Sequence, residues 1–134
     1  MTELNDVLGA MGQQLRGVWV LAIVDRDGML IASWEAPGNK LNPELLAGQF
    51  VLAVENLGKT IGQWGAELEA SIGVPMFTLE DLIMTTTFSY LMIRPISNGS
   101  CYLVIDSSKD VPLGMLRLAA TKYIPNLEKC LPGG

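Results

Sequence analysis

Two segments of the chain carry residues that suggest nucleotide chemistry. Residues 53–60 read AVENLGKT and fit a relaxed Walker A pattern, in which loop amides and a lysine hold phosphate groups. Residues 101–106 read CYLVID, an apolar run that ends in an aspartate, as in a Walker B strand. Together the two segments suggest a nucleotide-binding enzyme that uses Lys59 and Asp106.

The surroundings of the first segment argue against phosphate binding. A phosphate loop needs a glycine-rich turn between a strand and a helix. Residues 53–60 contain one glycine and continue a helical spacing of apolar residues that begins at Leu46. Glu55 would also place a like charge beside the phosphates. We therefore expect Lys59 on the polar face of a helix, and nucleotide binding is the weakest of three functional hypotheses.

Other catalytic chemistry has little support in the sequence. The chain contains no histidine, which removes Ser–His and Cys–His nucleophiles and histidine-ligated zinc. Cys101 and Cys130 have no metal-ligand spacing and are expected to be buried free thiols. Carboxylate pairs at 67/69 and 80/81 adjoin polar sequence, where charged side chains usually face solvent. We expect no catalytic residue, cofactor or metal.

The composition indicates one domain that covers surplus apolar surface with another protein chain. The chain has 134 residues, of which 49% are hydrophobic and 17% charged, and its net charge is −5. No apolar run approaches the roughly 18 residues that cross a bilayer, and no signal peptide is recognisable. The absence of a basic stripe disfavours nucleic acid as a partner. We expect a single domain over residues 1–134 that forms an oligomer in the cytoplasm without membrane insertion.

The clearest structural signal is a hairpin between Gly17 and Trp34. Seven apolar residues, 18–24, are followed by a polar turn at 25–28 and a second apolar run. Gly28 suits this turn because glycine readily adopts a positive φ. The first run does not alternate polar and apolar residues, so both of its faces should be covered. This predicts a central strand, in the middle of a sheet that lies between helices.

The remaining elements follow from similar patterns. Helices are expected over 3–16, over 43–68 after an Asn42 cap, and along a stripe from 113 to 131; further strands are expected over 82–88, 90–96 and 100–105. Asn98-Gly99 is a strong hairpin turn signal. The threonine-rich segment 82–88 is more polar than the other strands and is expected at a sheet edge.

Two lines of residues run along the second predicted helix. The expected core stripe comprises Leu46, Phe50, Val54 (or Ala53), Leu57, Ile61, Trp64 and Leu68. A neighbouring line of small residues comprises Ala47, Val51, Gly58, Gly62 and Gly65. Because each glycine costs about 1 kcal/mol relative to alanine in a helix, this line indicates either close approach of a second backbone or a locally broken helix.

The element order and two hairpins resemble the roadblock family, which includes dynein light chains and prokaryotic regulators of small Ras-like GTPases. The matching segments are GVWVLAIVDRDGMLIASW at 17–34 and RPI…NG…CYLVID at 94–106, and the resemblance spans essentially the whole chain. The turn near 87–90 departs from the family because it lacks the expected glycine. The resemblance implies an α/β three-layer sandwich of the roadblock/profilin-like type. In it a five-stranded antiparallel sheet carries the long second helix on one face and the two terminal helices on the other.

The resemblance also implies a homodimer. Family members typically pair their third strands edge to edge and place their second helices side by side. The expected dimer interface therefore joins the line of small residues to the edge strand: Ala47, Val51, Gly58, Gly62, Gly65, Ile83, Thr85 and Thr87. Four residues on the opposite side of the helix are expected to face a protein partner: Leu45, Gln49, Leu52 and Asn56.

The leading hypothesis is a homodimeric regulatory binding protein for a small Ras-like GTPase. Such a protein modulates the nucleotide cycle without catalytic residues of its own, by stabilising one arrangement of the GTPase switch loops. The alternative is a structural adaptor subunit of a motor or signalling complex that has no effect on GTP turnover.

Overall fold

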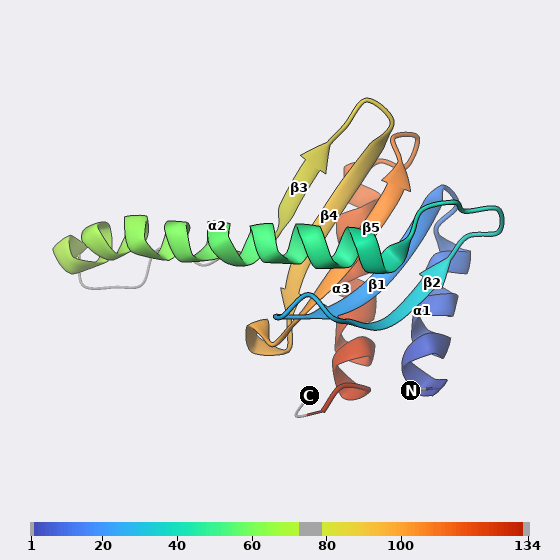
Figure 1. Ribbon diagram of the computed structural model, residues 1–134, viewed down its shortest axis with the longest axis horizontal. Coiled ribbons are helices and arrows are strands. Elements are labelled where there is room, and N and C mark those ends of the chain that lie inside the picture. The colour runs from blue at the N-terminus through green and yellow to red at the C-terminus, as the bar shows by residue number, and fades with distance from the viewer. Residues whose placement is uncertain (1, 73–78, 133–134) are drawn as a thin grey trace.

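A five-stranded sheet lies between two helical layers in the computed structural model of the chain, which describes residues 2–72 and 79–132. In chain order the elements are α1 (Thr2–Gln14), β1 (Val18–Asp25), β2 (Leu30–Glu35), α2 (Pro43–Ile72), β3 (Leu82–Thr85), β4 (Ser89–Ile96), the short 3₁₀ turn η1 (Ser97–Gly99), β5 (Cys101–Ser108) and α3 (Leu113–Lys129). All strand pairs are antiparallel, in the order β2-β1-β5-β4-β3. Figure 1 shows α2 across one face, with α1 and α3 on the other, so the predicted sandwich is confirmed.

The strand β1 lies inside the sheet, as its continuous apolar run predicts. It pairs with β2 on one side and with β5 on the other. Residues 20–24 are buried, and their side chains alternate between the core beneath α2 and the core beneath α1 and α3. The middle strand of the five is β5, so the prediction that the 18–24 strand lies in the middle is corrected: an apolar run is covered on both faces at any interior position.

The turns that join the strands have the local chemistry expected of them. In the β1–β2 turn, the Asp25 carboxylate accepts the backbone N–H groups of Asp27 and Met29 at 2.9 and 3.0 Å, and Gly28 has a φ of +85°. The predicted turn at 98–99 likewise has two successive positive φ angles, 57° and 83°.

The β3–β4 turn replaces the expected glycine with a threonine side chain. The hydroxyl of Thr86 accepts the N–H groups of Phe88 and Ser89 at 3.2 and 2.9 Å. This bonding closes the turn without a positive φ at a glycine. The strand β3 therefore ends at Thr85, earlier than predicted, and Thr87 lies in the turn. Since β3 pairs only with β4, the predicted edge position is confirmed.

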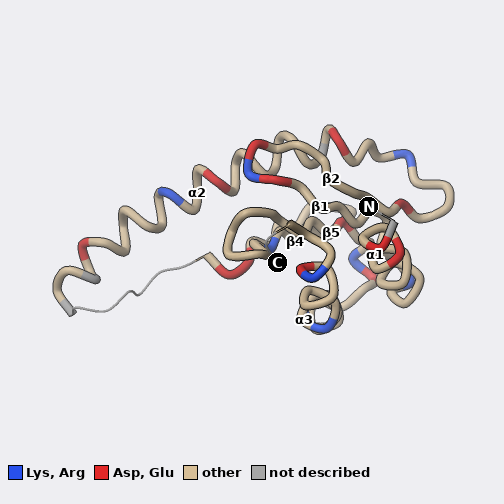
Figure 2. The backbone as a smooth tube through the Cα atoms, turned by 90° about the horizontal axis from the view of Figure 1, so that it is seen from below, with Lys and Arg blue, Asp and Glu red and all other residues tan. Residues whose placement is uncertain are grey.

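The helix α2 is much longer than the sheet is wide. Its start follows the prediction, because the Asn42 side chain accepts the N–H of Glu44 at 2.9 Å and Pro43 occupies the first helical position. Thirty residues give α2 a length of about 45 Å, whereas five strands span about 24 Å. The C-terminal half therefore projects beyond β3, which both views show (Figures 1 and 2).

The face that α2 turns to the sheet differs from the predicted core stripe. The buried residues are small: Ala47 and Val51, from the neighbouring line, are 0% exposed, and Val54, a member of the predicted core stripe, is 1% exposed as predicted. Phe50 packs partly against this core, as predicted, but three other members of the predicted stripe are exposed: Leu57 (45%), Trp64 (67%) and Leu68 (42%). The two lines are close neighbours around the helix, so helical periodicity alone did not identify the inward one.

The terminal helices pack as their stripes predict. In α1 the side chains of Leu4, Leu8 and Met11 are buried, as is that of Leu15 just after the helix, and in α3 those of Leu116, Ala120 and Leu127 are buried. Pro125 lies inside α3 without ending the helix. Among residues 2–72 and 79–132, no helix is long and apolar enough to cross a membrane.

Candidate functional site

The segment that resembles Walker A is helical throughout. Residues 53–60 lie inside α2, so their backbone amides are not arranged as a phosphate loop, in agreement with the prediction from sequence. Lys59 is exposed and lines a surface groove beside the β4–β5 turn. Asp106 does not line this groove and is almost wholly buried in β5. The two residues of the nucleotide hypothesis therefore do not share this groove.

Asp106 is a buried carboxyl group that sequence reasoning considered only as the aspartate of a Walker B-like strand. Its Oδ1 atom has no hydrogen-bond partner among the described residues. Burial raises the pKa of this carboxyl group, while hydrogen bonds from Ser89 and from the backbone of Ser107 act in the opposite direction. No described group of three or more cysteine, aspartate or glutamate side chains has an arrangement suited to a metal ion.

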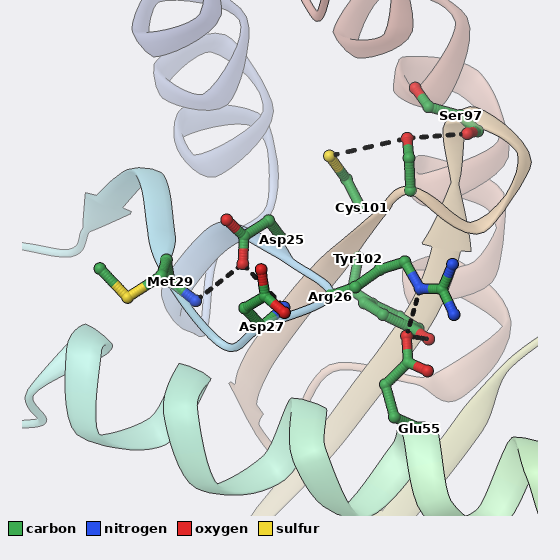
Figure 3. Close-up of polar contacts among 9 residues, drawn as sticks. Asp25, Arg26, Asp27, Met29, Glu55, Ser97, Cys101 and Tyr102 are labelled. Carbon is green, nitrogen blue, oxygen red and sulfur yellow. Dashed lines mark hydrogen bonds and ion pairs between the residues drawn. The ribbon is translucent and has the colours of Figure 1, made fainter.

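Three side chains from different elements form a polar network where α2 passes the β1–β2 turn and β5 (Figure 3). Glu55 of α2 accepts hydrogen bonds from Arg26 of the β1–β2 turn at 3.0 Å and from the hydroxyl of Tyr102 of β5 at 2.7 Å. The Arg26 and Tyr102 bonds lower the pKa of Glu55. Burial and the Glu55 bond raise the pKa of Tyr102 to about 12. The network fixes α2 over the sheet, and sequence reasoning missed it because its members are far apart in the chain.

The outward side of the N-terminal half of α2 carries the residues predicted to face a partner. Leu45 is 66% exposed and Leu52 is 51% exposed, and Gln49 and Asn56 are also exposed. Isolated exposed leucines are common, but these two lie two turns apart on one face of the helix. We call these four residues the outer face of α2.

The β1–β2 turn adds a methionine to this region. Gly28 lies against Gly48 so closely that a Cβ on Gly28 would be 3.3 Å from the Cα of Gly48. Gly48 is one helical turn from both Leu45 and Leu52. Met29, which follows Gly28, is 66% exposed and held by the Asp25 side chain. No sequence signal singled out Met29, because its place depends on contact between the turn and the helix.

A second exposed apolar region lies on the projecting half of α2. It contains Leu57, Ile61, Trp64 and Leu68, which recur every three or four residues and form one stripe. We call these residues the projecting stripe. Met84 of the edge strand and Phe88 of the following turn are also exposed.

The predicted dimer residues are placed in different surroundings. The prediction for Ala47 and Val51 is corrected: their side chains are wholly buried in the core of their own chain and do not reach a free surface. A Cβ at Gly58 or Gly62 would meet nothing within 4 Å, whereas Gly65 is buried. In the β3 region Ile83 is half-buried, and Thr85 and Thr87 are exposed.

Comparisons with known proteins show similarity at the level of the fold. No family model and no curated protein sequence matches the chain. Among solved structures, MglB of Myxococcus xanthus aligns with a TM-score of 0.71 and 21% identity, over 96% of this chain and 87% of that chain. An MglB described with a tetrameric arrangement gives 0.74 and 17%, with the same coverages. A Roadblock/LC7 domain from Streptomyces avermitilis gives 0.64 and 10%, over 95% and 96%. The chain therefore has the roadblock fold.

Proposed function

We propose that this chain is a cytoplasmic homodimer that binds a small Ras-like GTPase and modulates its nucleotide cycle. The roadblock fold supports this proposal, since the family includes regulators of such GTPases. The observation that carries it is the distribution of apolar residues on α2. The outer face and the projecting stripe lie on different sides of one helix, outside the core of the chain. Two exposed apolar regions on different sides of a helix suit two different partners.

The dimensions of α2 support a second copy as the partner of the projecting half. If two copies pair at β3, the sheet has ten strands and a width of about 48 Å. That width is close to the roughly 45 Å length of α2. The projecting half would then cover the sheet of the second copy, and its apolar stripe would be buried.

The backbone of β3 limits the registers that this pairing could adopt, and we propose one of them. The N–H of Thr86 donates to the carbonyl of Ser89 in β4. Because backbone groups alternate in direction along a strand, the N–H and C=O groups of Ile83 and Thr85 point away from β4. Both long helices lie on the same face only if paired residues are an even number of positions apart. Pairing Ile83 with Thr85 of the second copy meets both conditions and places Met84 on the two-fold axis.

Cysteine cross-linking tests this register. Residues that face each other on the axis have Cα atoms about 4.5 Å apart, which suits a disulfide. We expect Met84→Cys to form a covalent dimer on mild oxidation in a Cys130→Ser background. Ile83→Cys is the control, because its two copies would be two positions apart and beyond the roughly 7 Å limit. A covalent dimer from Ile83→Cys alone contradicts the register.

The regulatory activity requires no catalytic group from this chain. A partner that binds one switch arrangement more tightly than another shifts the population of the GTPase between them. A tenfold difference in affinity corresponds to about 1.4 kcal/mol. The outer face of α2 offers apolar contacts of this order, since burial of one leucine contributes about 1.5–3 kcal/mol.

The direct test measures GTP hydrolysis and nucleotide exchange by purified Ras-like GTPases of the source genome, with and without this chain. We expect binding and a changed rate for a cognate GTPase, both weakened by Leu52→Ser. Leu118→Ser is the matched control, since Leu118 is 71% exposed on α3, in the opposite layer. Binding with unchanged rates favours the structural adaptor. Absence of binding to every GTPase contradicts the proposal.

A further inference from the structure

An ionic cluster ties the start of the edge strand to the opposite helical layer. Asp81, the residue before β3, accepts a hydrogen bond from Arg94 of β4 at 3.1 Å. The same carboxylate oxygen lies 3.7 Å from Nε of Arg117 in α3. Arg94 also donates to the hydroxyl of Thr121 in α3 at 3.3 Å. One carboxylate thus connects three elements.

The cluster is partly removed from water. The side chains of Asp81 and Arg94 are 20% and 18% exposed, whereas that of Arg117 is 54% exposed. Charge-assisted bonds in such surroundings are stronger than those between freely exposed side chains. In the described part of the chain, the carboxylate of Asp81 forms ion pairs with both Arg94 and Arg117.

The position of β3 depends strongly on how its two ends are held. The strand has four residues and one neighbour, β4, so few ladder bonds fix it. At its C-terminal end the Thr86 side chain closes the turn to Ser89. At its N-terminal end Asp81 makes the bonds that hold the chain against β4 and α3.

We propose that Asp81 is a positioning residue that holds β3 in the geometry required for pairing with a second copy, an inference that rests on the proposed homodimer. Its carboxylate transmits the position of α3 to the dimerising edge through Arg117 and through the Arg94–Thr121 bond. Events on α3, in the layer opposite α2, therefore influence dimerisation without contact between α3 and the second copy.

The test compares Asp81→Asn with Glu80→Gln. Asp81→Asn removes the charge but keeps the size of the side chain, and we expect the dimer dissociation constant to rise about tenfold in sedimentation experiments. Hydrogen exchange should accelerate at residues 82–85 and stay unchanged in β1. Glu80 is exposed, has no ion pair with a described residue and is adjacent in sequence, so Glu80→Gln should leave both measurements unchanged. Asp81→Glu should recover part of the affinity.

The outcomes separate this inference from the proposed dimer. A wild-type chain that stays monomeric contradicts the homodimer, and hydrogen exchange of β3 then tests the anchoring role of Asp81 alone. Wild-type dimer affinity and exchange in Asp81→Asn overturn the inference. If Asp81→Asn does not fold, Arg117→Gln removes the longer and more exposed contact. That variant should weaken the dimer by a smaller factor, and an unchanged affinity would again overturn the inference.

Discussion

The two halves of α2 belong to one continuous helix but differ in what their side chains contact. The N-terminal half lies on the sheet, and its inward side chains are small, as at Ala47 and Val51. The C-terminal half projects beyond β3 (Figure 1). Its large apolar side chains, such as Leu57 and Leu68, are exposed. The large apolar residues of a helix thus need not all face the core of its own chain.

This difference explains why the large apolar residues of α2 were wrongly predicted to face the sheet. Large apolar residues usually mark the inward side of a helix. Here Gly28 of the β1–β2 turn lies close to the backbone of α2 at Gly48, and the adjoining core is filled by small residues. The larger residues are left for the region where a second chain is proposed to supply the missing surface.

The largest expected effect comes from a charge in the projecting stripe. Leu57→Asp would place a carboxylate in the proposed dimer interface, where an unpaired charge is costly. We expect the dimer dissociation constant to rise at least about a hundredfold in sedimentation equilibrium, with unchanged far-ultraviolet circular dichroism. Leu52→Asp, on the outer face, should leave the dimer intact. Equal loss of dimer in both variants would remove the distinction between the two halves.

The next largest effect concerns the contact between the N-terminal half of α2 and the β1–β2 turn. Gly28→Ala combines an unfavourable positive φ with a close contact to the backbone of Gly48. It should lower the free energy of unfolding by about 2–3 kcal/mol in urea titrations at fixed protein concentration. Gly38→Ala is the control, because Gly38 has a similar φ of +82° with open space around it, and should cost about 1 kcal/mol. Equal losses would show that the contact between the turn and α2 contributes nothing.

The smallest effect concerns the polar network that anchors α2. Tyr102→Phe removes one hydrogen bond to Glu55 and should lower the free energy of unfolding by about 1 kcal/mol near neutral pH. Because the folded-state pKa of Glu55 lies below its ordinary value of 4.5, this carboxylate stabilises the fold above that pH. The contribution is lost as the pH falls through the lowered pKa. Urea titrations of the wild type and Glu55→Gln should therefore converge in acid, and a constant difference at all pH values would contradict this linkage.

Local chemistry made most of the elements predictable. The cap at Asn42, the turns at 25–28 and 98–99, and the continuous apolar run of β1 each depend on residues close together in the chain. The stripes of the terminal helices were also correct, since one face of each helix packs against the sheet. The end of β3 was misplaced because the side chain of Thr86 closes the turn that a glycine was expected to form.

By itself, the sequence determined the order of helices and strands, the interior position of β1, the edge position of β3 and the helical state of residues 53–60. Only the tertiary structure decided which side of α2 faces the sheet, since two adjacent lines satisfy the same helical period. It also brought Glu55 to Arg26 and Tyr102, which lie 29 and 47 positions away. The physical reason is that periodicity and turn chemistry act over a few residues, whereas the rotation and reach of α2 depend on contacts between distant segments.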